Sequence, residues 1–150
     1  MKTILCLFSA ILLISASCQD KTNTTIPPQL LSTTHIAGTF KLVEPASKFD
    51  VTLVMTPDSS SSEIKNRVAY TLSGRSSVNQ YFGSFVGTTG SNDVQVSAIG
   101  STKMAGPADA MQFESDYFKK LQAVKRYEIT GNRLQLIIDG SNVLVYEKEK

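Results

Sequence analysis

The chain has few of the residues that build the common catalytic and metal sites. Its 150 residues include one histidine, two cysteines and no tryptophan. A histidine-dependent hydrolase needs a nucleophile and an orienting acid beside its base, and a zinc site needs several Cys, His or carboxylate ligands close together. The single histidine is His35, which we expect to be a solvated surface group. The composition therefore predicts a protein that is not an enzyme and that has no catalytic residues, metal or cofactor.

An excess of either charge is also absent. The chain carries 15 Lys and Arg residues against 13 Asp and Glu residues, and the two signs are interspersed along it. Domains that bind nucleic acid, and segments that bind membranes through a polybasic patch, show a clear basic excess. We therefore expect no nucleic acid among the partners of this protein.

The chain has no apolar run long enough to span a bilayer, but it begins with a shorter one. Lys2 precedes the apolar residues 4–14, and the small residues 15–17 stand directly before Cys18. A basic start, a short apolar run and small residues make up a secretory signal peptide. Small residues followed directly by a cysteine resemble the lipobox of bacterial lipoproteins. We expect residues 1–17 to be a lipoprotein signal peptide and Cys18 to be the lipidated residue.

Lipidation would place the protein in the cell envelope, in the outer membrane or on the periplasmic face of the inner membrane. Each buried methylene of an acyl chain such as palmitate contributes about 0.8 kcal/mol, so two or three chains anchor a protein durably. Cys6 would leave with the signal peptide, and Cys18 would then have no partner for a disulfide. The alternative is an ordinary signal peptide followed by a free cysteine.

Beyond Cys18 the composition divides the chain into two parts. The polar stretch up to residue 34 contains Pro27-Pro28 and shows no hydrophobic periodicity. Such a composition is typical of an extended linker, so residues 18–34 are expected to be the lipidated cysteine and a flexible tether. Residues 35–150 are long enough for one domain with a single core.

Most of this domain shows the alternation that is typical of β-strands. Phe49, Val51, Leu53 and Met55 fall on one face of residues 49–55. Seven further segments have strand character: 36–43, 67–73, 81–86, 94–99, 124–130, 134–139 and 143–147. Turn residues between the last three of these segments predict an antiparallel meander.

One segment, about residues 107–123, has a helical pattern. Pro107 suits a first helical position, and apolar side chains recur on one side. Glu114 falls near the middle of that apolar side, where a charge needs hydrogen bonds or an ion pair. We expect Glu114 to tie the helix to backbone amides or to a basic side chain such as Arg67, Arg75 or Lys103. The alternative is a ligand-facing acid at the mouth of a cavity.

These elements predict an α+β fold that is mainly antiparallel β. We expect a curved sheet or partial barrel of about seven to eight strands, with the helix packed against it.

Four stretches, in order, resemble the motifs of the META/HslJ family of small bacterial envelope domains. Residues 36–43 resemble its opening strand, and Met111, Glu114 and residues 127–136 fit its helix and final hairpins. The stretch Ser-Val-Asn-Gln-Tyr-Phe-Gly-Ser-Phe resembles its glycine-cysteine-asparagine motif, and Ser-Thr-Lys-Met-Ala-Gly resembles its threonine-arginine/lysine-methionine-alanine-cysteine motif. The matching residues of these two motifs are Asn79, Tyr81, Gly83, Thr102 and Met104. We interpret the motif residues as structural.

The resemblance also carries a departure and a functional implication. Both cysteines common in the family are missing here, at Val78 and Gly106, and their joint loss predicts that the two positions face each other. The family implies an envelope or secreted domain linked to stress tolerance and, in some members, to secretion. It implies no established catalytic site.

Three functions are compared on these grounds. The first is a non-enzymatic envelope lipoprotein that acts as a binding or assembly module, with an envelope protein as its partner. The second is a carrier or pilot-like protein that holds a small apolar ligand or a lipid chain within its curved sheet. The third is an enzyme, which no pattern of residues supports.

Overall fold

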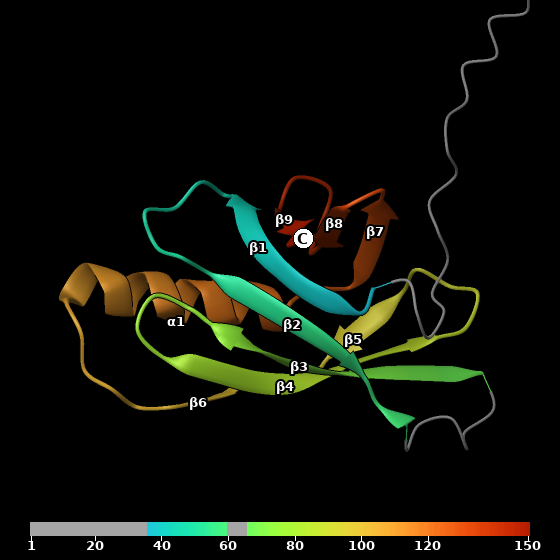
Figure 1. Ribbon diagram of the computed structural model, residues 1–150, viewed down its shortest axis with the longest axis horizontal. Helices are drawn as coiled ribbons and strands as arrows, with labels where there is room; N and C mark the ends of the chain where they lie inside the picture. Colours follow the sequence, from blue (N-terminus) through green and yellow to red (C-terminus); the bar gives the residue numbers. More distant parts are fainter. Residues whose placement is uncertain (1–35, 60–65) are drawn as a thin grey trace, which may run out of the picture.

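The computed structural model describes residues 36–59 and 66–150 (Figure 1). Within these ranges it contains one helix and nine strands. The helix is α1 (Ala108–Gln122). The strands are β1 (Gly38–Glu44), β2 (Thr52–Pro57), β3 (Arg67–Arg75), β4 (Gln80–Thr88), β5 (Val94–Val96), β6 (Gly100–Ser101), β7 (Arg126–Thr130), β8 (Arg133–Ile137) and β9 (Val143–Lys148).

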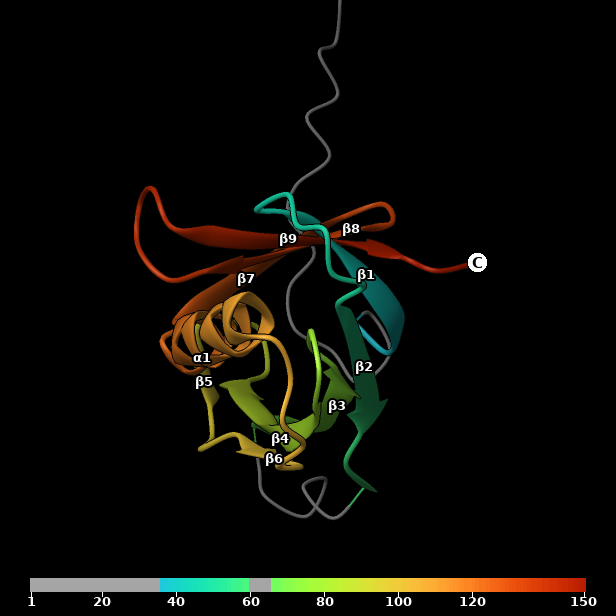
Figure 2. The same ribbon diagram turned by 90° about the vertical axis from the view of Figure 1, so that its left-hand side faces the viewer.

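The strands form one antiparallel sheet in which the first and last strands along the chain, β1 and β9, pair with each other. Its order is β5-β4-β3-β2-β1-β9-β8-β7, and the short β6 pairs with β4. The sheet folds over so that β7, β8 and β9 form one half and β2 to β5 form the other, with β1 between them (Figure 2). Strand β1 joins the halves, because it pairs with β2 on one side and with β9 on the other, from Phe40 opposite Lys148 to Glu44 opposite Val145.

The two end strands of the sheet meet at a single seam. One isolated bridge joins Asp93 to Arg126, the amide of Val94 donates to the carbonyl of Lys125 at 2.8 Å, and the amide of Tyr127 donates to the carbonyl of Asn92 at 3.0 Å. The sheet is therefore nearly closed into a barrel, and α1 lies on its open side between the two halves (Figure 2). The expected α+β, mainly antiparallel fold with one packed helix is confirmed.

The interior is filled by side chains from almost every strand. Alternate residues of a strand point to one face, and the inward positions are apolar, as in β2, where Leu53 and Met55 are buried. The helix adds Tyr117 and Leu121 to the same cluster. The largest fully buried side chains are Tyr70, Tyr81, Tyr127, Tyr146, Phe40, Phe85, Ile36, Leu53, Met55, Leu72 and Leu121.

A chain of buried hydroxyl groups links the helix to both halves of the sheet. The hydroxyl of Tyr117 lies 2.8 Å from that of Tyr81 on β4 and 3.0 Å from that of Tyr146 on β9. Tyr81 also donates to the carbonyl of Thr52 at 2.8 Å. Burial raises the pKa of Tyr117 and of Tyr146 far above that of a free phenol, so these groups stay neutral at physiological pH.

Several boundaries differ from the sequence prediction. Pro107 precedes the helix in an extended conformation, at φ −54° and ψ 145°, so it flanks α1 rather than opening it. Residues 49–51 lie outside β2, and β5 ends at Val96, with the unpredicted β6 following. In the described part of the chain, no helix is both long and apolar enough to cross a bilayer. The predicted signal peptide, Cys18, the tether and His35 lie outside the described residues.

Candidate functional site

Glu114 is the buried charged group of the described chain, with 5% of its surface exposed. It lies on the inward side of α1 and accepts hydrogen bonds from the turn that joins β3 to β4. The amide of Asn79 donates at 2.9 Å, the side-chain amide of Asn79 donates at 2.7 Å, and the hydroxyl of Ser76 donates as well. The amide of Val78 lies at 3.4 Å. The carboxylate therefore ties the helix to backbone amides, one of the two structural roles expected for it.

These donors stabilise the charged form of Glu114. Burial acts to raise the pKa of the carboxyl, but the hydrogen bonds from Ser76 and Asn79 outweigh it and hold the pKa below its usual value of 4.5. The alternative ion pair with Arg67, Arg75 or Lys103 is not formed, because the bonds to Glu114 come from uncharged groups. Of the two expected alternatives, backbone amides rather than a basic side chain hold the carboxylate, since the turn supplies enough donors.

Asn79 connects three segments that are far apart in the sequence. Its side-chain oxygen accepts from the Thr102 hydroxyl and from the Met104 amide, both at 2.7 Å. Its side-chain nitrogen donates to Glu114 and, at 3.2 Å, to the Met104 carbonyl. The β3–β4 turn itself is closed by the Ser76 amide, which donates to the Asn79 carbonyl at 2.9 Å. Asn79 holds the loop after β6 against the helix.

Two further contacts complete this arrangement. The Thr102 hydroxyl accepts from the Gln80 amide at 3.2 Å, and the Ser77 hydroxyl donates to the Ala110 carbonyl at 2.6 Å. The roles of Ser76 and Ser77 were not predicted from the sequence. A Ser-Ser pair three and two residues before Asn79 was the available signal, because Ser hydroxyls in turns bond to nearby backbone and side chains.

The remaining motif residues lie on β4 and in the loop after β6. Tyr81 is buried and belongs to the hydroxyl chain. Gly83 leaves room for Ile99, because a Cβ placed on Gly83 would lie 2.9 Å from Ile99 Cδ1. Met104 is held through its backbone alone, and its side chain is 54% exposed. Asn79, Thr102, Met104 and Glu114 line one surface hollow, whereas Tyr81 and Gly83 do not belong to it.

Val78 and Gly106 are in contact. A Cβ placed on Gly106 would lie 3.5 Å from Val78 Cβ and 2.6 Å from Val78 Cγ2. The two positions that differ from the family pattern thus face each other, with a branched side chain on one side and none on the other. The Val78 side chain fills the space in which the family would place a pair of cysteines.

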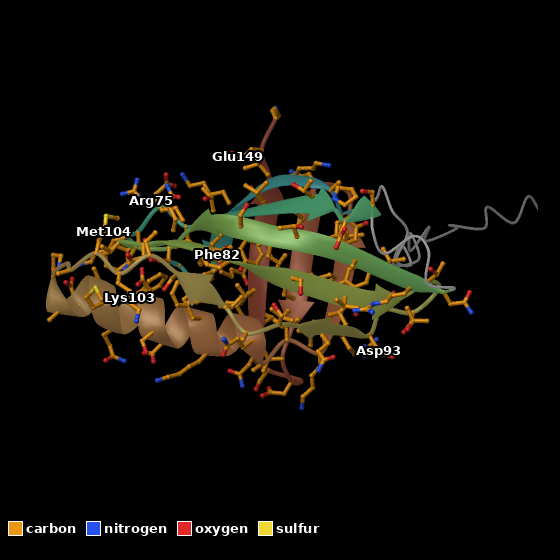
Figure 3. All side chains as sticks on the ribbon, turned by 90° about the horizontal axis from the view of Figure 1, so that it is seen from below. Arg75, Phe82, Asp93, Lys103, Met104 and Glu149 are labelled. Atoms are coloured by element: carbon orange, nitrogen blue, oxygen red, sulfur yellow. The ribbon has the colours of Figure 1, made fainter. Side chains whose placement is uncertain are left out.

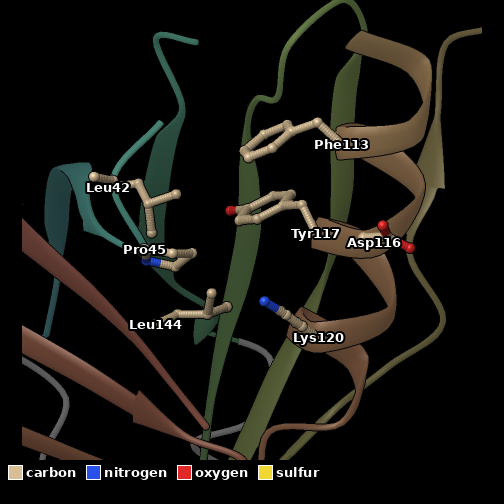
Figure 4. A pocket seen from close by; sticks show the side chains of 8 residues that line it. Leu42, Pro45, Phe113, Asp116, Tyr117, Lys120 and Leu144 are labelled. Carbon is tan, nitrogen blue, oxygen red and sulfur yellow. The ribbon is translucent and has the colours of Figure 1, made fainter. Parts of the chain in front are cut away.

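A cavity that the sequence did not reveal lies between α1 and the pair β1–β9 (Figure 4). Its volume is about 260 Å³. Lys120 reaches toward it from the helix, whereas the carboxylate of Asp116 points away. The other lining residues are mostly apolar: Leu42, Pro45, Ala46, Phe113, Tyr117 and Leu144. Among residues 36–59 and 66–150, no group of three or more His, Cys, Asp or Glu side chains is placed to hold a metal ion.

This combination defines a class of small β-rich domain: a nearly closed antiparallel sheet, a single helix in its open side, and a buried Glu–Asn contact between them. The META domain family profile matches residues 34–150, and the chain belongs to the META domain family.

A solved structure shares the fold. It is an NMR structure of a protein from Burkholderia xenovorans, with a TM-score of 0.54 and 20% sequence identity over 75% of this chain and 81% of that chain. At this identity the likeness concerns the fold alone. No curated protein matches the chain.

Proposed function

We propose that this META-domain protein is a non-enzymatic, lipid-anchored protein of the bacterial cell envelope that acts as a binding or assembly module, linked to envelope stress tolerance or secretion. The proposal rests on the structural role of the family-motif residues Glu114 and Asn79. Glu114 and Asn79 are buried, and their polar atoms bond to one another, to the β3–β4 turn and to the loop after β6. A carboxylate whose acceptor sites are filled by fixed donors is not placed to take a proton from a substrate.

A rigid end of the domain results from this bonding. The β3–β4 turn, the loop after β6 and the start of α1 are cross-linked by hydrogen bonds, so their outer surfaces hold a fixed shape. Binding to a preformed surface avoids the entropic cost of ordering it. The location in the envelope rests on the sequence before Cys18 and on the family.

A carrier role is the second candidate, and the cavity beside α1 favours it. The interior of the sheet is occupied by core side chains, so a ligand would lie in this cavity rather than within the sheet. Its apolar lining with one ammonium group at the rim suits a small amphipathic carboxylate. The volume of about 260 Å³ limits such a ligand to a short chain or a single ring.

Native mass spectrometry of the full chain, purified gently from its own membranes, tests both roles. A complex with an identified envelope protein would support the binding module. A small adduct would support the carrier, and the variant Ala46→Phe should abolish it, because Ala46 is an exposed lining residue whose enlargement fills the cavity. A chain without either adduct, in every preparation, would contradict both functions.

A further inference from the structure

The large apolar side chains that the described residues expose are Phe82 at 59%, Met104 at 54% and Met111 at 36%. They come from a strand, a loop and the helix, yet they line two adjoining hollows. Phe82 lines a hollow of about 570 Å³, and Met104 and Met111 line another of about 390 Å³. Thr102 belongs to both hollows. Apolar side chains scattered singly need no explanation, but a contiguous group on a hollowed surface is typical of an interaction site.

The position of Phe82 makes this surface continuous. Phe82 lies opposite Gly100 of β6, and its ring occupies the space in which a side chain at position 100 would lie. On the other side it lies opposite Ser73, another small residue. The ring thus lies over the strand from which the loop with Lys103 and Met104 departs (Figure 3).

Two cations stand on the same surface. Arg75 lines the hollow with Phe82, and Lys103 lines the hollow with Met104. The ion pairs of the described residues involve other cations: Lys41, Lys48, Lys119, Arg126 and Arg133. The charge of Arg75 helps to lower the pKa of Asp50, but Asp50 forms its ion pair with Lys41, at 2.6 Å. The acid that lines these hollows is Glu114, which is buried and bonded inward.

We propose that this surface, formed by Arg75, Phe82, Lys103, Met104 and Met111, binds an acidic peptide segment with apolar side chains from a partner protein. The inference rests on the proposed binding function and assigns its surface. Arginine pairs with carboxylates through two parallel hydrogen bonds, and methionine adapts its shape to apolar side chains. The surface is hollowed, which suits the side chains of a peptide better than the flat plane of a membrane.

A methionine-methyl NMR titration tests the proposal. The full chain, labelled at its methionine methyls, is held in nanodiscs of zwitterionic phosphatidylcholine. The ligand is the synthetic peptide Asp-Leu-Glu-Phe-Asp-Leu-Glu, and the matched control peptide has Lys in place of every Asp and Glu. We expect the acidic peptide to shift the signals of Met104 and Met111. Met55 is 1% exposed and serves as the internal control that should not move.

Matched variants separate charge from position. The double variant Arg75→Gln/Lys103→Gln should weaken binding of the acidic peptide, measured by fluorescence anisotropy, by at least tenfold. The double variant Arg67→Gln/Lys125→Gln removes the same charge from exposed positions elsewhere and should change the affinity less than twofold. Phe82→Ser/Met104→Gln keeps the charges and should also weaken binding, because both side chains are exposed and their loss leaves the core intact.

Four results would overturn the inference. Equal binding of the acidic and basic peptides would contradict it, and so would an equal loss of affinity in the two charge variants. A shift of Met104 and Met111 by nanodiscs containing phosphatidylglycerol, without a response to the acidic peptide, would assign the surface to anionic lipid instead. A native complex with an envelope protein that survives Arg75→Gln/Lys103→Gln would leave the proposed function standing and refute this surface alone.

Discussion

The substitution Glu114→Gln removes one charge from the core contact while keeping the size of the side chain. In the wild-type protein the carboxylate accepts three short hydrogen bonds, from the Ser76 hydroxyl and from the amide and side chain of Asn79. An amide has only one acceptor oxygen, so its nitrogen must face at least one of these donors. The Asn79 side chain cannot rotate to accept, because its own oxygen is held by Thr102 and Met104.

The expected loss follows from these contacts. Leaving one buried donor unsatisfied costs about 1–3 kcal/mol, and the bonds that remain lose their charge assistance, which is worth about 1 kcal/mol. Part of this is offset, because the amide has a smaller desolvation cost than the carboxylate. We expect Glu114→Gln to lower the free energy of unfolding by about 2–4 kcal/mol. For a domain of this size that corresponds to a drop in Tm of about 8–16 °C.

Thermal unfolding followed by circular dichroism measures this loss, and its pH dependence tests the cause. The pKa of Glu114 is depressed in the folded protein, so its stabilisation is present above pH 4.5 and is lost as the pH falls through the folded pKa. The gap in stability between wild type and Glu114→Gln should therefore narrow below pH 4.5. Carboxylates other than Glu114 are common to both proteins and cancel in the comparison.

The control is Glu147→Gln, which makes the same change at an exposed position on β9 and should alter stability by less than about 0.5 kcal/mol. A loss below 1 kcal/mol for Glu114→Gln at pH 7 would refute the reasoning, and so would a gap that stays constant between pH 7 and pH 3. Unchanged stability with altered ligand binding would favour the ligand-facing role instead.

Three further changes test other contacts. Val78→Cys/Gly106→Cys should form a disulfide on oxidation, since the two Cβ positions lie 3.5 Å apart, and should stabilise the fold by up to about 3–4 kcal/mol; two free thiols by mass spectrometry of the oxidised protein would contradict the contact. Tyr117→Phe removes the hydroxyl that contacts Tyr81 and Tyr146, and should cost about 1–3 kcal/mol in chemical denaturation; a loss under 0.5 kcal/mol would show that the hydroxyl chain does not stabilise the helix contact. Cys18→Ser should move the protein from the membrane fraction to the soluble fraction of cells, and retention in the membrane would refute lipidation.

The sequence predicted the parts of the fold that depend on local periodicity. The alternation in residues 49–55 placed Val51, Leu53 and Met55 inside, and all three are buried. The helical pattern located α1 to within one residue at each end and placed Glu114 among apolar neighbours. These features repeat every two or every three to four residues, so a short window contains them.

What the sequence did not predict depends on contacts between distant segments. Nothing near Glu114 in the sequence indicates that its donors come from the β3–β4 turn, 35 positions away. The pairing of β1 with β9 and the cavity between this pair and α1 have no local pattern either. The contact between Val78 and Gly106 is the distant contact that the sequence did indicate. Both positions lack the cysteine that is common in the family, and positions that pair are expected to change together.

The pairing of β1 with β9 has a consequence for the order in which the protein acquires its structure. Strands β1 to β5 follow one another along the chain and can pair as they emerge, but the other half of the sheet is joined to them by continuous strand pairing through the last strand and otherwise by the short seam beside β5. Contacts between the two ends of a chain form slowly, because a long loop must close before they are gained. Until β9 arrives, β1 presents an unpaired edge, and a chain that is shortened before Val143 keeps that edge permanently. Truncated or stalled chains of this protein are therefore expected to associate through β1.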